Sequence, residues 1–128
     1  MIRILHMEEY RDLRKLLSFI LSSQGVEVTG VGDGESGIEE LAKSDFDAIV
    51  LTQETPLMTG HAVLEWIVTN RPHLLSRVLF TIGSPSTPAL DTELAKLQIP
   101  VFPKPFSVHA LAERIKSVAA DKNGHRAA

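Results

Sequence analysis

The sequence predicts an α/β fold, a doubly wound three-layer sandwich of five βα units around a five-stranded parallel sheet. Short apolar runs alternate with amphipathic segments along the chain, a pattern typical of strands joined by crossover helices. The run at 47–52 is the most continuously apolar, as expected for a central strand covered by helices on both faces. A length of 128 residues suits one domain.

The first two predicted strands flank a long helix. Residues 2–7 are expected to form the first strand, and Gly25 is expected to end the helix that follows it. Val26, Val28 and Val31 indicate the second strand. The apolar residues at helical spacing between the two strands are Leu13, Leu16, Leu17, Ile20 and Leu21.

The middle of the chain continues the alternation. Residues 32–34 have the composition of a turn, and a short second helix follows them. The strand at 47–52 comes next, and then a helix over about 61–69. The inner face of the short second helix is expected to comprise Ile38, Leu41 and Ala42.

A proline marks the end of the third predicted helix. The pair at 71–72 ends the third helix, because proline lacks a backbone donor and restricts the residue before it. Residues 77–82 are predicted to form the fourth strand and 83–88 a loop. A helix over about 89–97 should follow.

The last predicted strand is short and contains Val101 and Phe102. Ser107 is a suitable N-cap for a final helix, because its hydroxyl can accept a hydrogen bond from a backbone amide of the first turn. The domain should therefore extend over 1–120, with a polar tail at 121–128. The core face of the final helix is expected to comprise Leu111, Ile115 and Val118.

Composition restricts the function. A net charge of -3 offers no broad basic surface, so direct binding of nucleic acid or of a membrane is not expected. No segment approaches the roughly 20 apolar residues of a membrane span. The chain has no cysteine, which rules out disulfides and thiolate chemistry and favours a cytoplasmic location.

Polar residues follow four of the predicted strands. Glu8 and Glu9 come after the first strand, 52–54 after the third, 81–84 after the fourth, and Lys104 after the fifth. In a doubly wound sheet these positions meet beyond the carboxyl ends of the strands. Acids and a lysine gathered there suit a divalent cation and an anionic oxygen group.

Two motifs give a specific resemblance. Residues 56–60 read Pro-Leu-Met-Thr-Gly, and residues 104–106 read Lys-Pro-Phe. Together with the acidic pair Glu8 and Glu9, they make 2–120 resemble a receiver domain of the bacterial two-component response regulators, of the chemotaxis-regulator type. The resemblance implies a flavodoxin-like fold and a role in phosphorelay signal transduction, as a signalling module and not an enzyme.

The resemblance also implies roles for single residues. In that family an acidic pair helps to hold magnesium, and here the pair is Glu8 and Glu9. The aspartate that accepts a phosphoryl group corresponds to Thr52, and the family's lysine to Lys104. A backbone carbonyl two residues past the acceptor would also bind the metal, and here it belongs to Glu54.

Three features of the family's site differ in this chain. Thr52 carries a neutral hydroxyl, which is not a carboxylate nucleophile and cannot form an acyl phosphate. Glu8 and Glu9 keep both charges on longer arms, so magnesium binding is expected to be weakened and not required. The hydroxyl that senses phosphorylation in the family falls on Ile82 or, shifted by one residue, on Thr81.

Each of these residues also has a purely structural interpretation. Thr52 can serve as a β-branched residue at a strand end whose hydroxyl bonds a neighbouring carbonyl. Glu8 and Glu9 can form a solvated cap on the first helix, and Lys104 can be their counter-ion. A cis peptide bond before Pro105 is expected from the family.

Two histidines have to be assigned a place in the fold. His6 falls within the first strand and is expected to be a packed core residue. His61 begins a helix beside the pocket, where surface placement is the simpler expectation and a functional role stays open.

We therefore expect a pseudo-receiver that binds a signalling protein, either a histidine kinase or a downstream regulator, without the usual phosphotransfer. It could also form a homodimer through the surface made by the fourth helix, fifth strand and fifth helix. The residues expected on that surface are Leu90, Leu94, Val101, Phe102 and Val108.

Two alternatives remain open. One is a phosphorelay intermediate that uses Thr52 or Glu54 as a replacement acceptor, although the side chain of Glu54 need not enter the pocket. The other is a metal-binding or nucleotide-binding enzyme on the same kind of sheet. Against the second, the sequence contains neither of the common glycine-rich phosphate loops.

Overall fold

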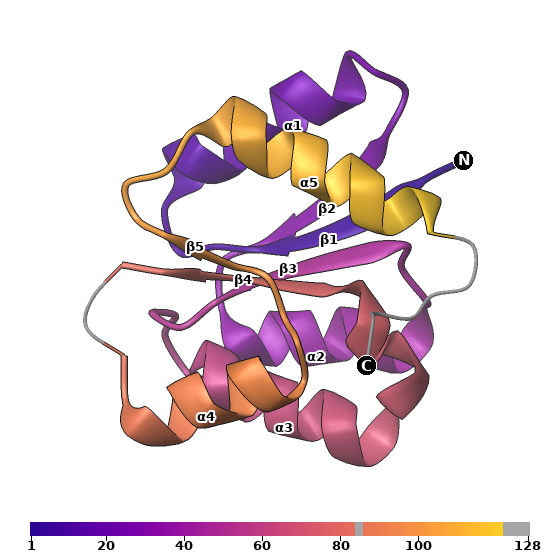
Figure 1. Ribbon diagram of the computed structural model, residues 1–128. Helices are drawn as coiled ribbons and strands as arrows, with labels where there is room; N and C mark the ends of the chain where they lie inside the picture. The colour runs from indigo at the N-terminus through magenta and orange to yellow at the C-terminus, as the bar shows by residue number, and fades with distance from the viewer. Residues whose placement is uncertain (84–85, 122–128) are drawn as a thin grey trace.

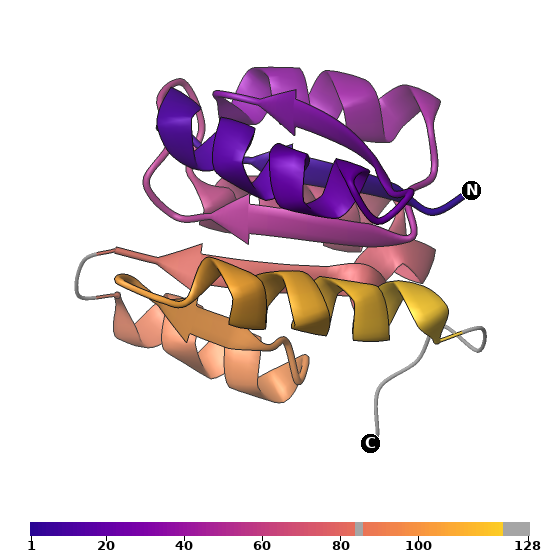
Figure 2. The ribbon, with the colours of Figure 1, turned by 90° about the horizontal axis from the view of Figure 1, so that it is seen from above.

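The computed structural model, described over residues 1–83 and 86–121, contains one five-stranded parallel sheet with the strand order β2-β1-β3-β4-β5 (Figure 1). Seen from above, the strands run in the same direction (Figure 2). The strands are β1 (Arg3–Met7), β2 (Glu27–Val31), β3 (Ala48–Thr52), β4 (Val78–Ile82) and β5 (Val101–Pro103). The helices are α1 (Arg11–Ser22), α2 (Gly34–Lys43), α3 (Gly60–Asn70), the 3-10 helix η1 (Pro72–Arg77), α4 (Pro88–Lys96) and α5 (Val108–Ala120). The predicted fold class is confirmed.

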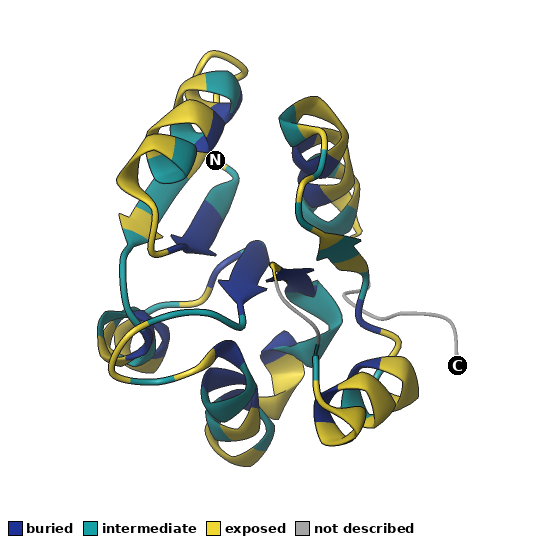
Figure 3. Cartoon of the chain, turned by 90° about the vertical axis from the view of Figure 1, so that its left-hand side faces the viewer, coloured by how far each residue is buried: buried dark blue, intermediate teal, exposed yellow. Residues whose placement is uncertain are grey.

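Helices cover both faces of the sheet, with α1 and α5 on one side and α2, α3 and α4 on the other (Figures 1 and 3). Successive side chains of a strand point to opposite faces, so each strand supplies both halves of the core. Residues packed on the α1 and α5 side include Ile4, Leu17, Val50, Leu79, Leu111 and Ile115. Residues packed on the other side include Leu5, Leu41, Ile49, Leu51, Leu64, Phe80 and Leu90.

The burial of β3 and β4 explains why the run of apolar residues at 47–52 is continuous. Every residue of β3 and β4 is buried, because both strands have neighbours on either side and helices on both faces. The continuous apolar run predicted at 47–52 is thus a central strand. The edge strand β2 is partly exposed, which suits its mixed sequence.

Side-chain caps begin four of the helices. Ser107 accepts a hydrogen bond from the amide of Ala110, as predicted, and Thr59 and Thr87 cap α3 and α4 in the same way. The predicted turn at 32–34 also contains the start of α2. Asp33 is the N-cap of α2, and Gly34 already belongs to that helix.

Ala42, expected on the inner face of α2, is exposed, and so is Leu16 of the apolar pattern in α1. Other differences lie at element boundaries. Residues 72–77 form a 3-10 helix, so β4 begins one residue later than predicted. Proline at position 88 lies inside the first turn of α4, where its missing N–H has no helical partner to lose. The predicted loop at 83–88 and tail at 121–128 lie partly outside the described residues. No described helix is both long and apolar enough to cross a bilayer.

Candidate functional site

The loops that follow β1, β3, β4 and β5 meet at the carboxyl end of the sheet, which faces the viewer in Figure 3. They surround a pocket of about 450 Å³. The residues lining it are Tyr10, Glu54, Gly83, Lys104 and Pro105. The convergence predicted from the parallel sheet therefore occurs, and it brings an acid, a lysine and an aromatic ring together.

A partly buried ion pair joins the loop after β1 to the loop after β5. The Glu8 side chain is 1% exposed, and its Oε1 lies 2.8 Å from Nζ of Lys104, whose side chain is 18% exposed. The other carboxylate oxygen, Oε2, accepts a hydrogen bond from the amide of Tyr10 at 3.0 Å. Both oxygens of Glu8 are thus engaged by donors of the protein itself.

The acidic pair predicted at the end of β1 does not act as a pair. Glu9 is exposed, as a solvated cap would be, but Glu8 is buried, so that interpretation is wrong for Glu8. Arg14 fixes the turn that separates them, because its Nη1 donates to the carbonyl of Glu8 at 2.6 Å and to that of Glu9 at 3.1 Å. The two carboxylates therefore lie in different environments.

Lys104 is held from several sides. In addition to its bond with Glu8, its ammonium group lies 5.6 Å from the centre of the Tyr10 ring, within the range of a cation–π contact. Its backbone amide donates to the carbonyl of Ile82 at 2.7 Å. The peptide bond to Pro105 is cis, as expected. The lysine is thus placed as the counter-ion of a buried carboxylate.

Thr52 is fully buried at the carboxyl end of β3. Its hydroxyl donates a hydrogen bond to the backbone carbonyl of Thr81, the residue opposite it in the β3–β4 ladder, at 3.1 Å. Gly60 packs against the carbonyl of Thr52 so closely that an added Cβ would lie 2.3 Å from that oxygen. The hydroxyl of Thr52 is therefore committed to a structural bond between strands, as the structural interpretation of this residue predicted.

The positions proposed for the phosphorylation sensor are both buried. Thr81 is 2% exposed, and Ile82, at the end of β4, belongs to the apolar core on the α3 side of the sheet. The structure thus places an aliphatic side chain at the position that the family spacing favours for a hydroxyl.

The structure settles the position of the Glu54 side chain, which the sequence left open. It lines the pocket, and its Oε1 accepts a hydrogen bond from the amide of Gly83 at 2.8 Å. This bond joins the loop after β3 to the loop after β4. No sequence signal indicated it, because the two residues lie 29 positions apart.

These donors do not suit a magnesium ion. Mg²⁺ prefers octahedral oxygen ligands, usually with at least one carboxylate free to bind it. The carboxylate of Glu8 is engaged by Lys104 and by an amide, Glu9 is exposed, and the Thr52 hydroxyl donates to a carbonyl. Within 1–83 and 86–121, the acids of this pocket do not form a group of three converging ligands.

His6 is a packed core residue, as predicted. It is 2% exposed, and its Nδ1 is buried without a hydrogen-bond partner in the described structure. Burial lowers the pKa of His6 from its ordinary 6.5 to about 3, and the positive charges of Arg14 and Lys104 contribute in the same direction. The ring is therefore neutral in the folded protein near pH 7.

The surface predicted to bind partners is only partly apolar and exposed. Leu90 and Leu94 belong to α4, but both are buried in the core, so their assignment to that surface is wrong. Both lie on the inner face of α4, where i, i+4 spacing directs them to the sheet. Val101 is 42% exposed, while Phe102 and Val108 are half-buried.

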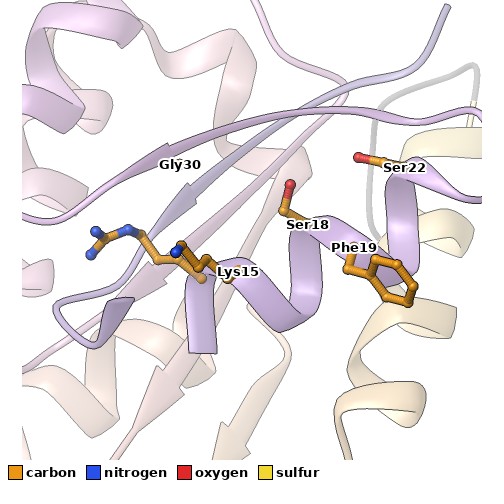
Figure 4. A pocket seen from close by; sticks show the side chains of 6 residues that line it. Lys15, Ser18, Phe19, Ser22 and Gly30 are labelled. Atoms are coloured by element: carbon orange, nitrogen blue, oxygen red, sulfur yellow. The ribbon is translucent and has the colours of Figure 1, made fainter. Parts of the chain in front are cut away.

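One exposed aromatic residue on another face of the molecule was not identified by sequence analysis. Phe19 on α1 is 74% exposed and lines a groove between α1 and β2 (Figure 4). The other residues lining this groove are Arg14, Lys15, Ser18, Ser22 and Gly30. The signal was present, because Phe19 falls outside the helical spacing that defines the core face of α1.

Residues 4–116 match the family model of the response regulator receiver domain, and the chain belongs to that family. It is 29% identical over 124 residues to the sensory transduction protein RegX3 of Mycolicibacterium smegmatis, covering 92% of this chain. The match covers 50% of RegX3, so the chain spans half the length of that relative.

Solved structures agree with the fold. A CheY-like receiver domain of Methanospirillum hungatei superposes with a TM-score of 0.84 at 19% identity, covering 96% of this chain and 97% of the other. The response regulator TrrA of Thermotoga maritima, solved in complex with Mg²⁺ and BeF, gives 0.71 at 21% identity, covering 92% and 99%. Receiver domains are signalling modules of two-component systems, and some hold magnesium.

Proposed function

We propose that this chain is a receiver domain that signals by binding a protein partner, without phosphorylation of an aspartate. The observation that carries the proposal is the buried hydroxyl of Thr52, which donates to the carbonyl of Thr81. The resemblance aligns this residue with the family's acceptor aspartate. A hydroxyl in that state offers no carboxylate for an acyl phosphate.

The geometry of Lys104 supports the proposal. A lysine that stabilises a phosphoryl group must be able to reach it, but this ammonium is 2.8 Å from a carboxylate that is 1% exposed. Separating the two would leave a buried charge without a partner, which is strongly unfavourable. The acid that could otherwise hold a metal therefore serves to hold the lysine.

Partner binding has to use surfaces other than the acceptor pocket. The apolar groups available in the described structure include Val101 on the edge strand β5, the half-buried rings of Phe102 and Phe106, and Phe19 on α1. Tyr10, Leu16 and Leu57 are exposed as well. The rings of Phe102 and Phe106 pack edge to face, with centroids 6.3 Å apart. A histidine kinase or a downstream regulator is the class of partner that the family implies, and a cytoplasmic location for this chain is part of the proposal.

Treatment with acetyl phosphate and Mg²⁺, followed by intact-mass spectrometry, tests the proposal. The wild type should keep its mass, while a receiver domain with an acceptor aspartate, treated in parallel, should gain one phosphoryl group. Thr52→Asp is the matched variant, since uptake by this variant alone would assign the loss to one residue. A hydroxylamine-labile phosphate on the wild type would refute the proposal, and an acid-stable ester on Thr52 would favour the relay alternative.

A further inference from the structure

A cluster of potential metal ligands lies between α3 and α4, outside the acceptor pocket. His61 is in the first turn of α3, Glu65 lies one turn further along the same helix, and Glu93 projects from α4. The two helices lie side by side on the same face of the sheet (Figures 1 and 3). The cluster therefore joins two elements through three side chains.

The distances within the cluster match those of a metal site. Nε2 of His61 lies 3.1 Å from Oε1 of Glu93 and 3.6 Å from Oε1 of Glu65. The three ligand atoms all lie within 4.8 Å of one another. Ligands about 2.1 Å from a tetrahedral Zn²⁺ are about 3.4 Å apart, so small rotations of the side chains would bring the three atoms to one ion.

The cluster is accessible to solvent, and a neighbouring side chain holds the backbone of His61. The His61 and Glu93 side chains are 27% and 26% exposed, and Glu65 lies at the open side of the cluster. The side-chain oxygen of Gln53, the residue after Thr52, accepts a hydrogen bond from the amide of His61 at 2.8 Å. An ion could thus enter from solvent and keep a water as a fourth ligand, as three-ligand zinc sites do.

The carboxylate oxygens of Glu65 and Glu93 lie within 4.8 Å of each other and of the His61 ring nitrogen, so one ion can reach both carboxylates. A divalent cation would satisfy both carboxylates together. Imidazole with carboxylates is a ligand set that suits first-row transition metals, whereas Mg²⁺ prefers oxygen ligands alone.

We propose that His61, Glu65 and Glu93 form a binding site for a divalent transition metal of the Zn²⁺ type that bridges α3 and α4. The ion replaces the Nε2–Glu93 hydrogen bond with direct ligation, and the proton of the neutral imidazole then resides on Nδ1. This site does not depend on whether Thr52 can be phosphorylated.

Titration of the metal-free full chain with Zn²⁺ by calorimetry, and with Co²⁺ by visible absorption, tests the site. We expect saturable binding with one ion at this site, a Co²⁺ spectrum that reports nitrogen and oxygen ligation, and little response to Mg²⁺. Loss of an outer-shell partner weakens metal sites by about 10–100-fold, so His61→Ala and Glu93→Gln, which remove ligands, should weaken Zn²⁺ binding at least that much. Glu65→Gln, at the most exposed ligand, should do the same with little effect on folding.

His73→Ala is the matched control. His73 also faces a carboxylate, with Nε2 3.2 Å from Oδ1 of Asp45, but it is not in the three-ligand cluster. Its removal should leave Zn²⁺ affinity unchanged. The proposal is overturned if the wild type shows no saturable Zn²⁺ binding, or if the folded His61→Ala and Glu65→Gln variants bind as tightly as the wild type.

Discussion

Replacing Lys104 with methionine should destabilise the fold, because the lysine is the partner of a buried carboxylate. Methionine keeps most of the apolar stem and removes the charge. Breaking a buried ion pair by removing one partner costs about 3–5 kcal/mol. Since the Lys104 side chain is 18% exposed and Tyr10 still donates its amide to Glu8, we expect the lower end, about 3 kcal/mol.

Urea unfolding and thermal melting, both followed by circular dichroism, measure this loss of stability. In a domain of this size, 1 kcal/mol corresponds to roughly 3–5 °C in Tm, so Lys104→Met should melt roughly 10 °C below the wild type. Adding Glu8→Gln to Lys104→Met removes the uncompensated charge. The double variant should recover part of the loss, with a coupling energy of up to about 3 kcal/mol for two residues in contact.

Lys43→Met is the matched control for the loss of a lysine. Lys43 pairs with Glu40 at 3.2 Å on the surface of α2, and its side chain is 65% exposed. Such i, i+3 pairs contribute at most about 0.5 kcal/mol. If Lys104→Met unfolds at the same urea concentration as Lys43→Met, Lys104 does not stabilise the fold through Glu8, and the structural assignment of this lysine is refuted.

Two further predictions concern the core near the pocket. The pKa of His6 is about 3 in the folded state and 6.5 ordinarily. Burial of the neutral ring therefore carries no protonation cost above pH 6.5, and the unfolding free energy falls by about 1.4 kcal/mol per pH unit as the pH drops from 6.5 toward 3. His6→Leu should flatten the dependence of unfolding free energy on pH between 6 and 4, and an unchanged slope would contradict the assignment. Gly60→Ala should destabilise by about 1–3 kcal/mol or more in urea unfolding, since the new Cβ meets the Thr52 carbonyl at 2.3 Å and the Phe80 ring at 2.8 Å. Gly30→Ala is its control, because the nearest atom there is a flexible Arg14 carbon at 3.5 Å, and equal losses in both variants would argue against the close packing.

Local chemistry determined much of the fold in advance. The apolar run of β3 and the cap at Ser107 depend on neighbours in sequence, and the structure confirms both. The helix α1 ends at Ser22, slightly before the glycine predicted to stop it, and Gly25 lies in the turn that follows. Gly25 takes a positive φ of 82°, which glycine adopts without strain. The convergence of Glu8, Thr52 and Lys104 at one edge followed from the parallel sheet, because strand direction places those ends together.

Only the tertiary structure decided how those residues are used. Whether Glu8 is solvated or buried depends on Lys104, 96 positions away, and the hydroxyl of Thr52 is committed by a carbonyl 29 positions away. Burial of Leu90 and Leu94 and the meeting of His61 with Glu93 likewise depend on how α4 packs against the sheet and α3. Spacing in sequence sets which face of an element a residue occupies, but its partner comes from another element, and that pairing is fixed only when the layers pack.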